Sequence, residues 1–234
     1  MSEVKPKEKD PAHKPWPKFD LKTVMAARDS GDFDRGDRPR DHLYASELGY
    51  CARAVWMGWH NPQPFDKEFT EGRGALGHAI EELMVEKLGM AKSGGLIVAR
   101  EVSFRDEKVS GRADFFLRLT KGTPQFPLEL KTTAAFDRFM DTPPNSHLLQ
   151  LRWYLTQAPD APFGLLTYYN LSSWGGGLGK WDTLRVERDD EAVEKRVSYL
   201  WRIVHQDREP ACEAEDPTDC WDCKIHSDKR GVPT

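Results

Sequence analysis

Apolar and charged residues alternate in the stretch Phe126 to Thr132, which reads FPLELKT. Alternation with a period of two is typical of a β-strand whose two faces meet different surroundings. Leu128 and Leu130 therefore share the face that points toward a hydrophobic core. Glu129 and Lys131 share the opposite face, so the pattern predicts an acid and an amine side by side.

A second strand is predicted just before this one, from Arg112 to Leu119, where apolar and aromatic residues dominate. The Gly and Pro within residues 120–124 predict the turn that joins the two strands. In such a hairpin Asp114 comes close to Glu129 and Lys131. Two neighbouring carboxylates indicate a cation between them, because burying them unpaired is costly. Taken alone, however, the stretch favours a solvated pair of charges across the strands.

The rest of the chain predicts helices and strands in a mixed order around this hairpin. Helices are predicted for Phe19–Ser30, for Ser46–His60 with Ser46 as N-cap, for Thr70–Leu88, for Asn145–Gln157, and for Asp189–Gln206 with Asp189 as N-cap. Strands are predicted for Leu96–Phe104, Phe163–Asn170 and Trp181–Val186. This order predicts an α/β protein whose central strands carry the carboxylates.

Length and charge set the scale of the molecule. Its 234 residues suffice for one domain with a real core, and the net charge of −4 gives no overall nucleic-acid signature. Residues 1–42 predict a flexible polar tail with a short helix, 43–226 a single domain and 227–234 a C-terminal tail. No apolar run approaches a membrane span and the N-terminus lacks a signal-peptide core, so we expect a cytoplasmic protein.

The four cysteines stand in two groups far apart in the sequence: Cys51, and then Cys212, Cys220 and Cys223 within the segment 207–226. In a reducing compartment such residues bind metal more often than they form disulfides. Four thiolates suit a 4Fe–4S cluster or one tetrahedral Zn²⁺. The alternative is a local zinc knuckle that adds His226 to the last three cysteines and leaves Cys51 out. Either centre has a structural role, because it closes a long loop.

Two of the predicted helices carry polar residues that suit a site. Gln150 and Tyr154 lie four residues apart in the helix Asn145–Gln157, and they therefore share one face. His78 lies within the apolar pattern of the helix Thr70–Leu88. By itself it is more typical of an ordinary helix histidine than of a metal ligand.

In chain order, these groups resemble a known family. Three successive motifs resemble those of the RecB-like branch of the PD-(D/E)XK nuclease superfamily: Gly111-x-x-Asp114, Glu129-x-Lys131 and Gln150-x-x-x-Tyr154. His78 stands where this branch has an additional histidine on an upstream helix. The cysteines resemble those of its iron–sulfur nucleases, among them the CRISPR-associated exonucleases and the AddB nuclease domain. The chain departs from that pattern in one respect, because its long cysteine gap precedes the short one.

The resemblance implies a restriction-endonuclease-like core, a central mixed β-sheet flanked by helices, with a C-terminal metal-cluster segment. It also implies a DNA nuclease that hydrolyses phosphodiester bonds with bound Mg²⁺ or Mn²⁺. The implied catalytic residues are Asp114, Glu129 and Lys131. The implied ligands of the divalent ion are His78, Asp114, Glu129 and the Leu130 carbonyl. The implied iron–sulfur ligands are Cys51, Cys212, Cys220 and Cys223.

The resemblance further implies an exonuclease that acts on single-stranded ends in recombination, repair, phage replication or CRISPR adaptation. Partners would then be DNA and the CRISPR integration or recombination proteins. DNA contacts are expected from Gln150, Tyr154, Arg112 and Arg152. Core positions are favoured over base-stacking platforms for Trp153, Tyr168 and Tyr169. An endonuclease and a non-catalytic DNA-binding subunit of the same fold are the alternatives, and the intact charged residues of the hairpin argue against the second.

Overall fold

The computed structural model describes residues 40–61, 76–86, 97–118, 123–171, 180–215 and 220–223. Residues 1–39 of the predicted N-terminal tail, with the helix Phe19–Ser30, lie outside the described residues, as do the predicted C-terminal tail and His226. The division into a tail, one domain and a second tail therefore stays a prediction. No helix among the described residues is long and apolar enough to cross a membrane.

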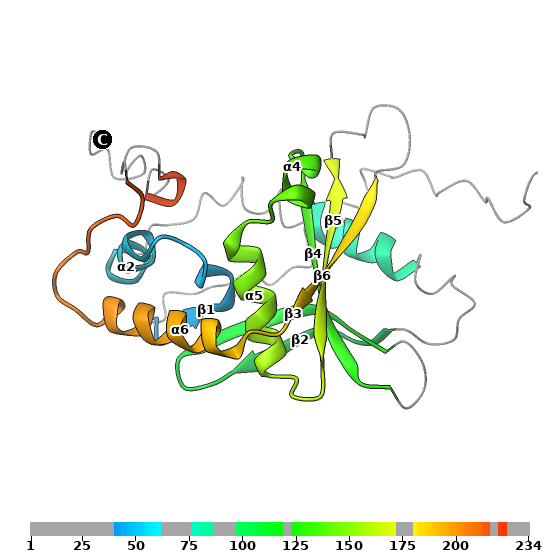
Figure 1. Cartoon of the computed structure of the whole chain (residues 1–234), viewed down its shortest axis with the longest axis horizontal. Helices are drawn as coiled ribbons and strands as arrows, with labels where there is room; N and C mark the ends of the chain where they lie inside the picture. Colours follow the sequence, from blue (N-terminus) through cyan, green and yellow to red (C-terminus); the bar gives the residue numbers. More distant parts are fainter. Residues whose placement is uncertain are drawn as a thin grey trace, which may run out of the picture.

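The centre of the fold is a six-stranded mixed sheet in the order β1-β3-β4-β5-β6, with β2 paired to β3 (Figure 1). Its strands are β1 (Leu43–Tyr44), β2 (Ile97–Arg105), β3 (Val109–Arg118), β4 (Gln125–Thr133), β5 (Phe163–Asn170) and β6 (Trp181–Glu187). β1 pairs with β3 and β4 with β5 in parallel, whereas the other neighbours are antiparallel. All five predicted strands are present, and among the strands of the described residues only the two-residue strand β1 was not predicted. The mixed α/β prediction is confirmed.

Helices cover the sheet on both sides. They are α2 (Ala52–His60), α4 (Phe136–Asp141), α5 (Asn145–Thr156) and α6 (Asp190–Val204), together with the helical residues 76–86. α5 lies on one face of the sheet, and α2 and α6 pack beyond it (Figure 1). Ile80 and Met84 of the helix 76–86 pack with Phe115 and Leu128 in a second core on the other face. Each face thus has its own core, as the alternating strands predict.

The predicted start of the helix Ser46–His60 was wrong. Ala45–Glu47 forms a short 3₁₀ helix, and α2 begins only at Ala52, with Cys51 rather than Ser46 at its N-cap position. Gly49 explains the interruption, because a Cβ there would lie 2.2 Å from Cα of Ser146 at the start of α5. The chain must leave the helix to pass α5 at this closeness. Tertiary packing has here overridden local helix propensity.

The other helices agree with the sequence pattern, with one omission. Asp189 caps α6 through its side chain, which accepts a hydrogen bond of 3.1 Å from the backbone N–H of Ala192. The helix predicted over Thr70–Leu88 is helical throughout its described part, residues 76–86. The six-residue helix α4 was not predicted. It carries one buried residue, Phe136, and is too short to show a helical period.

Candidate active site and cysteine centre

The strands β3 and β4 separate at the position of the predicted carboxylates. Their ladder ends at the pair Phe115 and Leu128. Asp114 and Glu129 are the next residues on either side of the gap. The Leu130 N–H donates to the Asp114 carboxylate at 2.7 Å. The divergence therefore opens a site between the two strands, and the hydrogen bond from Leu130 holds the Asp114 carboxylate in one orientation.

Glu129 and Lys131 point into this gap from β4. The Lys131 Nζ donates to Glu129 Oε1 at 2.6 Å, and the Glu129 side chain is almost fully buried. The second oxygen, Oε2, is buried and has no hydrogen-bond partner among the described residues. An unsatisfied buried carboxylate oxygen is costly, and a cation would satisfy it. The oxygen donors of Asp114 and Glu129 are those that Mg²⁺ and Mn²⁺ prefer, so the residues present fit such an ion.

Gln150 and Tyr154 of α5 extend this set into a chain of hydrogen bonds. Gln150 Oε1 accepts from Lys131 Nζ at 3.0 Å, and its Nε2 donates to the Tyr154 hydroxyl at 3.1 Å. That hydroxyl donates to the backbone carbonyl of Arg112 at 2.8 Å. Gln150 is 6% exposed and Tyr154 is 1% exposed. The two residues thus orient the Lys131 side chain, and they are themselves almost inaccessible to solvent.

Burial and mutual repulsion dominate the electrostatics of the gap. Burial raises the pKa of Asp114 well above its usual value, and the neighbouring Glu129 raises it further. Burial also raises the pKa of Glu129, which the charge of Lys131 partly offsets. Burial alone would lower the pKa of Lys131, but Glu129 and Asp114 outweigh it and leave that pKa raised. Lys131 is therefore a cation at neutral pH. Its single positive charge does not balance both carboxylates, so a bound divalent ion would supply the missing positive charge.

A second acidic group adjoins this gap. His78 Nδ1 lies 3.4 Å from Glu81 Oε2, and the ligand atoms of His78, Glu81 and Glu101 all lie within 4.8 Å of one another. In the β2–β3 register Glu101 stands between the residues that face Phe115 and Ala113, which places it opposite Asp114. The charge of Glu81 also raises the pKa of Asp114 and Glu129. The predicted His78 thus lies in an acidic group beside the strand carboxylates.

The residues Glu81 and Glu101 were not predicted. Glu81 follows His78 at i+3 and so shares its face, which is a signal that the sequence does contain. Glu101 gave no such signal, because its place depends on an irregularity of β2 and on a backbone φ of 48°.

The predicted DNA contacts have different surroundings. Arg112 has a half-exposed side chain and pairs with Glu101 at 3.3 Å. Arg152 is less exposed and lies 3.7 Å from the Asp189 carboxylate. The core interpretation of the aromatic residues is confirmed by the burial of Trp153, Tyr168 and Tyr169. Of the predicted contacts, Arg112 is therefore the most accessible to a ligand.

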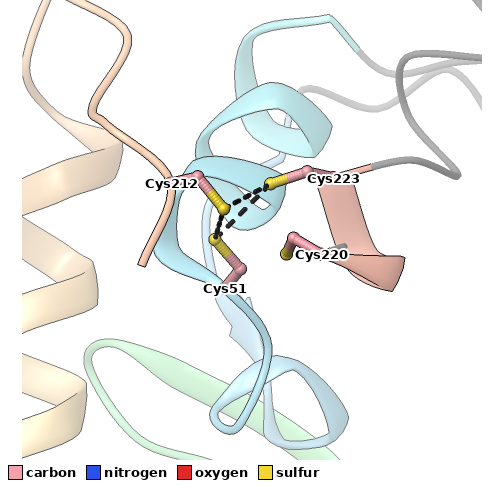
Figure 2. Close-up of side chains that lie close together, drawn as sticks. All are labelled: Cys51, Cys212, Cys220 and Cys223. Atoms are coloured by element: carbon pink, nitrogen blue, oxygen red, sulfur yellow. Dashed lines mark hydrogen bonds between the residues drawn. The ribbon is translucent and has the colours of Figure 1, made fainter. Parts of the chain in front are cut away.

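The four cysteines come together at one point beside α2 (Figure 2). Cys51 Sγ lies 3.7 Å from the sulfur of Cys212 and 3.5 Å from that of Cys223, and the last two are 3.6 Å apart. The Cys220 sulfur lies within 4.8 Å of the other three. Cys51 is therefore a full member of the group, contrary to the alternative of a knuckle that leaves it out.

Polar groups surround this cysteine centre and connect its two ends. The Asp222 carboxylate accepts from the Cys51 N–H at 2.9 Å, and the Glu213 carboxylate accepts from the Ala52 N–H at 2.7 Å. Glu213 also donates its own N–H to Cys51 Sγ at 3.4 Å. These contacts join the beginning of α2 to the segment that follows α6. The cysteine centre thus has the surroundings of a structural metal site.

Tyr50 links the cysteine centre to the active-site gap. It directly precedes Cys51, is 38% exposed, and its carbonyl accepts a hydrogen bond from Arg196 Nη2. Its phenol lies close enough to contribute to the raised pKa of Lys131. Sequence reasoning did not single it out, because its place depends on the close approach of the preceding Gly49 to the start of α5.

Stability should fall in mild acid because of His147. Burial lowers the pKa of His147 to about 4 from 6.5, and Lys131 contributes to the same shift. The unfolded chain therefore binds more protons between these values, so the stabilising effect is complete above pH 6.5 and is lost as the pH falls toward 4. We expect the free energy of unfolding in urea to drop by about 2 kcal/mol between pH 7 and pH 5 from this residue.

The variant His147→Gln isolates this effect. Its unfolding free energy should depend less on pH than that of the wild type by the same amount, whereas the exposed His205→Gln should match the wild type. Equal pH dependence in the wild type and His147→Gln would contradict the assignment.

Comparison with solved structures identifies the fold. SSO0001 matches with a TM-score of 0.50 and 17% identity, over 80% of this chain and 87% of that one. A phage-related exonuclease from Haemophilus somnus 129PT has a TM-score of 0.46 at 12% identity, over 70% of this chain and 93% of its own. The alkaline exonuclease LHK-Exo from Laribacter hongkongensis has 0.43 at 11% identity, over 71% and 89%. No protein-family model and no curated protein matches the sequence. At this identity the likeness to SSO0001 shows a shared fold: a central mixed β-sheet flanked by helices.

Proposed function

We propose that this protein is a metal-dependent DNA nuclease, an exonuclease that acts on single-stranded ends. The observation that carries the proposal is the buried, unpartnered Oε2 of Glu129 in the gap where β3 and β4 separate. It lies beside a second, half-buried carboxylate and a lysine whose amine is already oriented. This combination suits the hydrolysis of a phosphodiester, which needs an activated water and stabilisation of negative charge.

Each residue then has a distinct part. A divalent ion bound here would lower the pKa of a water and offset charge on the phosphate. Asp114 and Glu129 would hold that ion, with the Leu130 carbonyl and His78 as further ligands. The Lys131 ammonium would orient the attacking water and stabilise the developing charge on phosphorus oxygens. The Leu130 N–H fixes the Asp114 carboxylate, so this ligand needs no rearrangement on binding.

The DNA contacts divide by exposure. Gln150 and Tyr154 are buried, so in this proposal they act on the substrate only by holding Lys131. Arg112 lies on the strand that carries Asp114 and is exposed enough to meet a phosphate. Arg152 would reach DNA only after leaving Asp189. The proposed setting is recombination, repair, phage replication or CRISPR adaptation in the cytoplasm, with integration or recombination proteins as partners. In that setting the cysteine centre, whether iron–sulfur or zinc, is structural.

The test compares linear and circular single-stranded DNA in the presence of Mn²⁺ or Mg²⁺. An exonuclease releases nucleotides from 5′- or 3′-labelled linear DNA and leaves a circle of the same sequence intact. Cleavage of the circle would instead identify an endonuclease. DNA binding without cleavage of either substrate would identify a non-catalytic subunit and overturn the proposal.

Replacing His78 by alanine should weaken binding of the divalent ion. The imidazole is one of the ligand groups gathered beside the strand carboxylates, and loss of a metal ligand or its support weakens affinity by about tenfold or more. We expect the Mn²⁺ concentration for half-maximal activity to rise by that factor, with activity partly recovered at high Mn²⁺. The exposed His205→Ala is the control. An unchanged Mn²⁺ dependence would exclude His78 as a ligand.

A further inference from the structure

The spacing of the four sulfurs distinguishes between the metals that four thiolates can hold. The sulfurs of Cys51, Cys212 and Cys223, which Figure 2 shows pointing toward one another, lie 3.5, 3.6 and 3.7 Å apart. All four sulfurs lie within 4.8 Å of one another. A tetrahedral ion with metal–sulfur bonds of about 2.3 Å holds its sulfurs about 3.8 Å apart. In a 4Fe–4S cluster each thiolate binds a different iron, which holds the sulfurs roughly 6 Å apart. The observed spacing fits one ion and does not fit the cluster.

The surrounding chain opposes the expansion that a cluster would require. Cys220 and Cys223 lie at the two ends of one helical turn, residues 221–223, and both are buried. Asp222 of the same turn holds the Cys51 N–H, so this turn cannot move away from α2 without losing that bond. Moving the sulfurs apart by more than 2 Å (roughly, from the two geometries above) would therefore break the contacts that bring the two ends of the chain together.

The charges near the sulfurs also suit a single ion. Four thiolates around one divalent ion leave two negative charges in excess. The N–H groups of Glu213 and Ala214 donate to the sulfurs of Cys51 and Cys212, each at 3.4 Å. Arg53 lies close enough to interact with the charges of Cys212 and Cys223. These donors and this cation stabilise the excess charge, as outer contacts of structural metal sites do.

We propose that Cys51, Cys212, Cys220 and Cys223 hold one tetrahedral Zn²⁺ in place of the iron–sulfur cluster that the resemblance implies. Zn²⁺ has no redox chemistry, so the centre serves as a fixed cross-link between α2 and the segment after α6. The inverted order of the cysteine gaps agrees with this departure. The proposal is independent of nuclease activity, and its test needs no DNA.

The test is the metal content of the full chain, purified without oxygen from cells supplied with both iron and zinc. We expect one zinc per chain, no iron, no acid-labile sulfide and no absorption in the visible range. Iron together with equimolar sulfide would establish a cluster and overturn the proposal. One iron without sulfide, or a folded protein without metal, would overturn it as well.

Cobalt substitution tests the geometry without a cysteine variant, which could fail to fold. Co²⁺ bound to four thiolates in a tetrahedron absorbs in the visible range, and we expect this spectrum at one Co²⁺ per chain, lost on addition of one equivalent of Zn²⁺. Absence of the tetrahedral thiolate spectrum at one Co²⁺ per chain would contradict the four-thiolate site. Asp160→Asn, in an exposed turn outside both the cysteine centre and the active-site gap, should give the same spectrum as the wild type, whereas Cys220→Ser should shift it.

Discussion

Replacement of Asp114 by asparagine is expected to lower DNA cleavage by about a thousandfold or more while the protein stays folded. Asparagine keeps the shape of the side chain and an oxygen that can accept the Leu130 N–H. It removes the negative charge that would hold a divalent ion beside Glu129. Initial rates on end-labelled single-stranded DNA, over a range of Mn²⁺ concentrations, measure the effect.

The stability of this variant should rise or stay unchanged without added metal, because a carboxylate whose pKa is raised by burial and by Glu129 is destabilising when charged. Asp160→Asn provides the matched control, since Asp160 is exposed in a turn far along the chain from the gap. Near-normal cleavage by Asp114→Asn, with a normal midpoint of unfolding, would show that the gap between β3 and β4 is not the catalytic site.

The sequence predicted the part of the site that lies on regular strands. Alternation alone put Glu129 and Lys131 on one face of β4, and the structure joins them by a hydrogen bond of 2.6 Å. The approach of Asp114 required more, because it depends on the point at which β3 and β4 separate. Alternation determines the face of a residue, but the length of a ladder is determined by packing along the whole sheet.

Irregular backbone hid the remaining residues. Glu101 itself has a left-handed backbone within β2, and Tyr50 lies in the irregular residues between the 3₁₀ helix and α2. Neither has a periodic pattern from which a face could be predicted. Similarly, α4 is too short to show a period. The pattern placed Gln150 and Tyr154 on one helix face but could not predict whether that face is exposed, and it is buried.

Convergence of the cysteines was predicted from ligand number rather than from geometry. Cys51 has no cysteine near it in the sequence, and the later three lack a fourth thiolate, so joining them completes a site. The sulfur spacing, in contrast, is set by how closely the turn 221–223 packs against the start of α2. Nothing in the order of residues determines that distance, so the sequence could not predict the sulfur spacing.

Replacement of Cys51 by serine should release the metal and lower stability by about 3 kcal/mol or more, or roughly 10 °C in Tm. Three ligands cannot complete a closed tetrahedral site, and the serine hydroxyl is a poor replacement for a thiolate. Thermal unfolding followed by circular dichroism, with zinc content measured in parallel, gives both effects. Glu215→Ser places the same residue at an exposed position of the same segment and should change neither.

In Cys51→Ser, the segment after α6 should lose its structure to different degrees along its length. Residues 206–213 keep other ties to the fold, because Trp56 Nε1 donates to the Gln206 carbonyl at 2.9 Å, and Arg53 and Arg196 pair with Glu209 and Glu213. Residues 220–223 have mainly the sulfurs and the Asp222 contact, and that contact is made to the backbone of Cys51 itself. Limited proteolysis of Cys51→Ser should therefore cut near residues 220–223 first and near Glu209 only later. Simultaneous cleavage at both places would mean that the metal, and not these polar contacts, holds the entire segment.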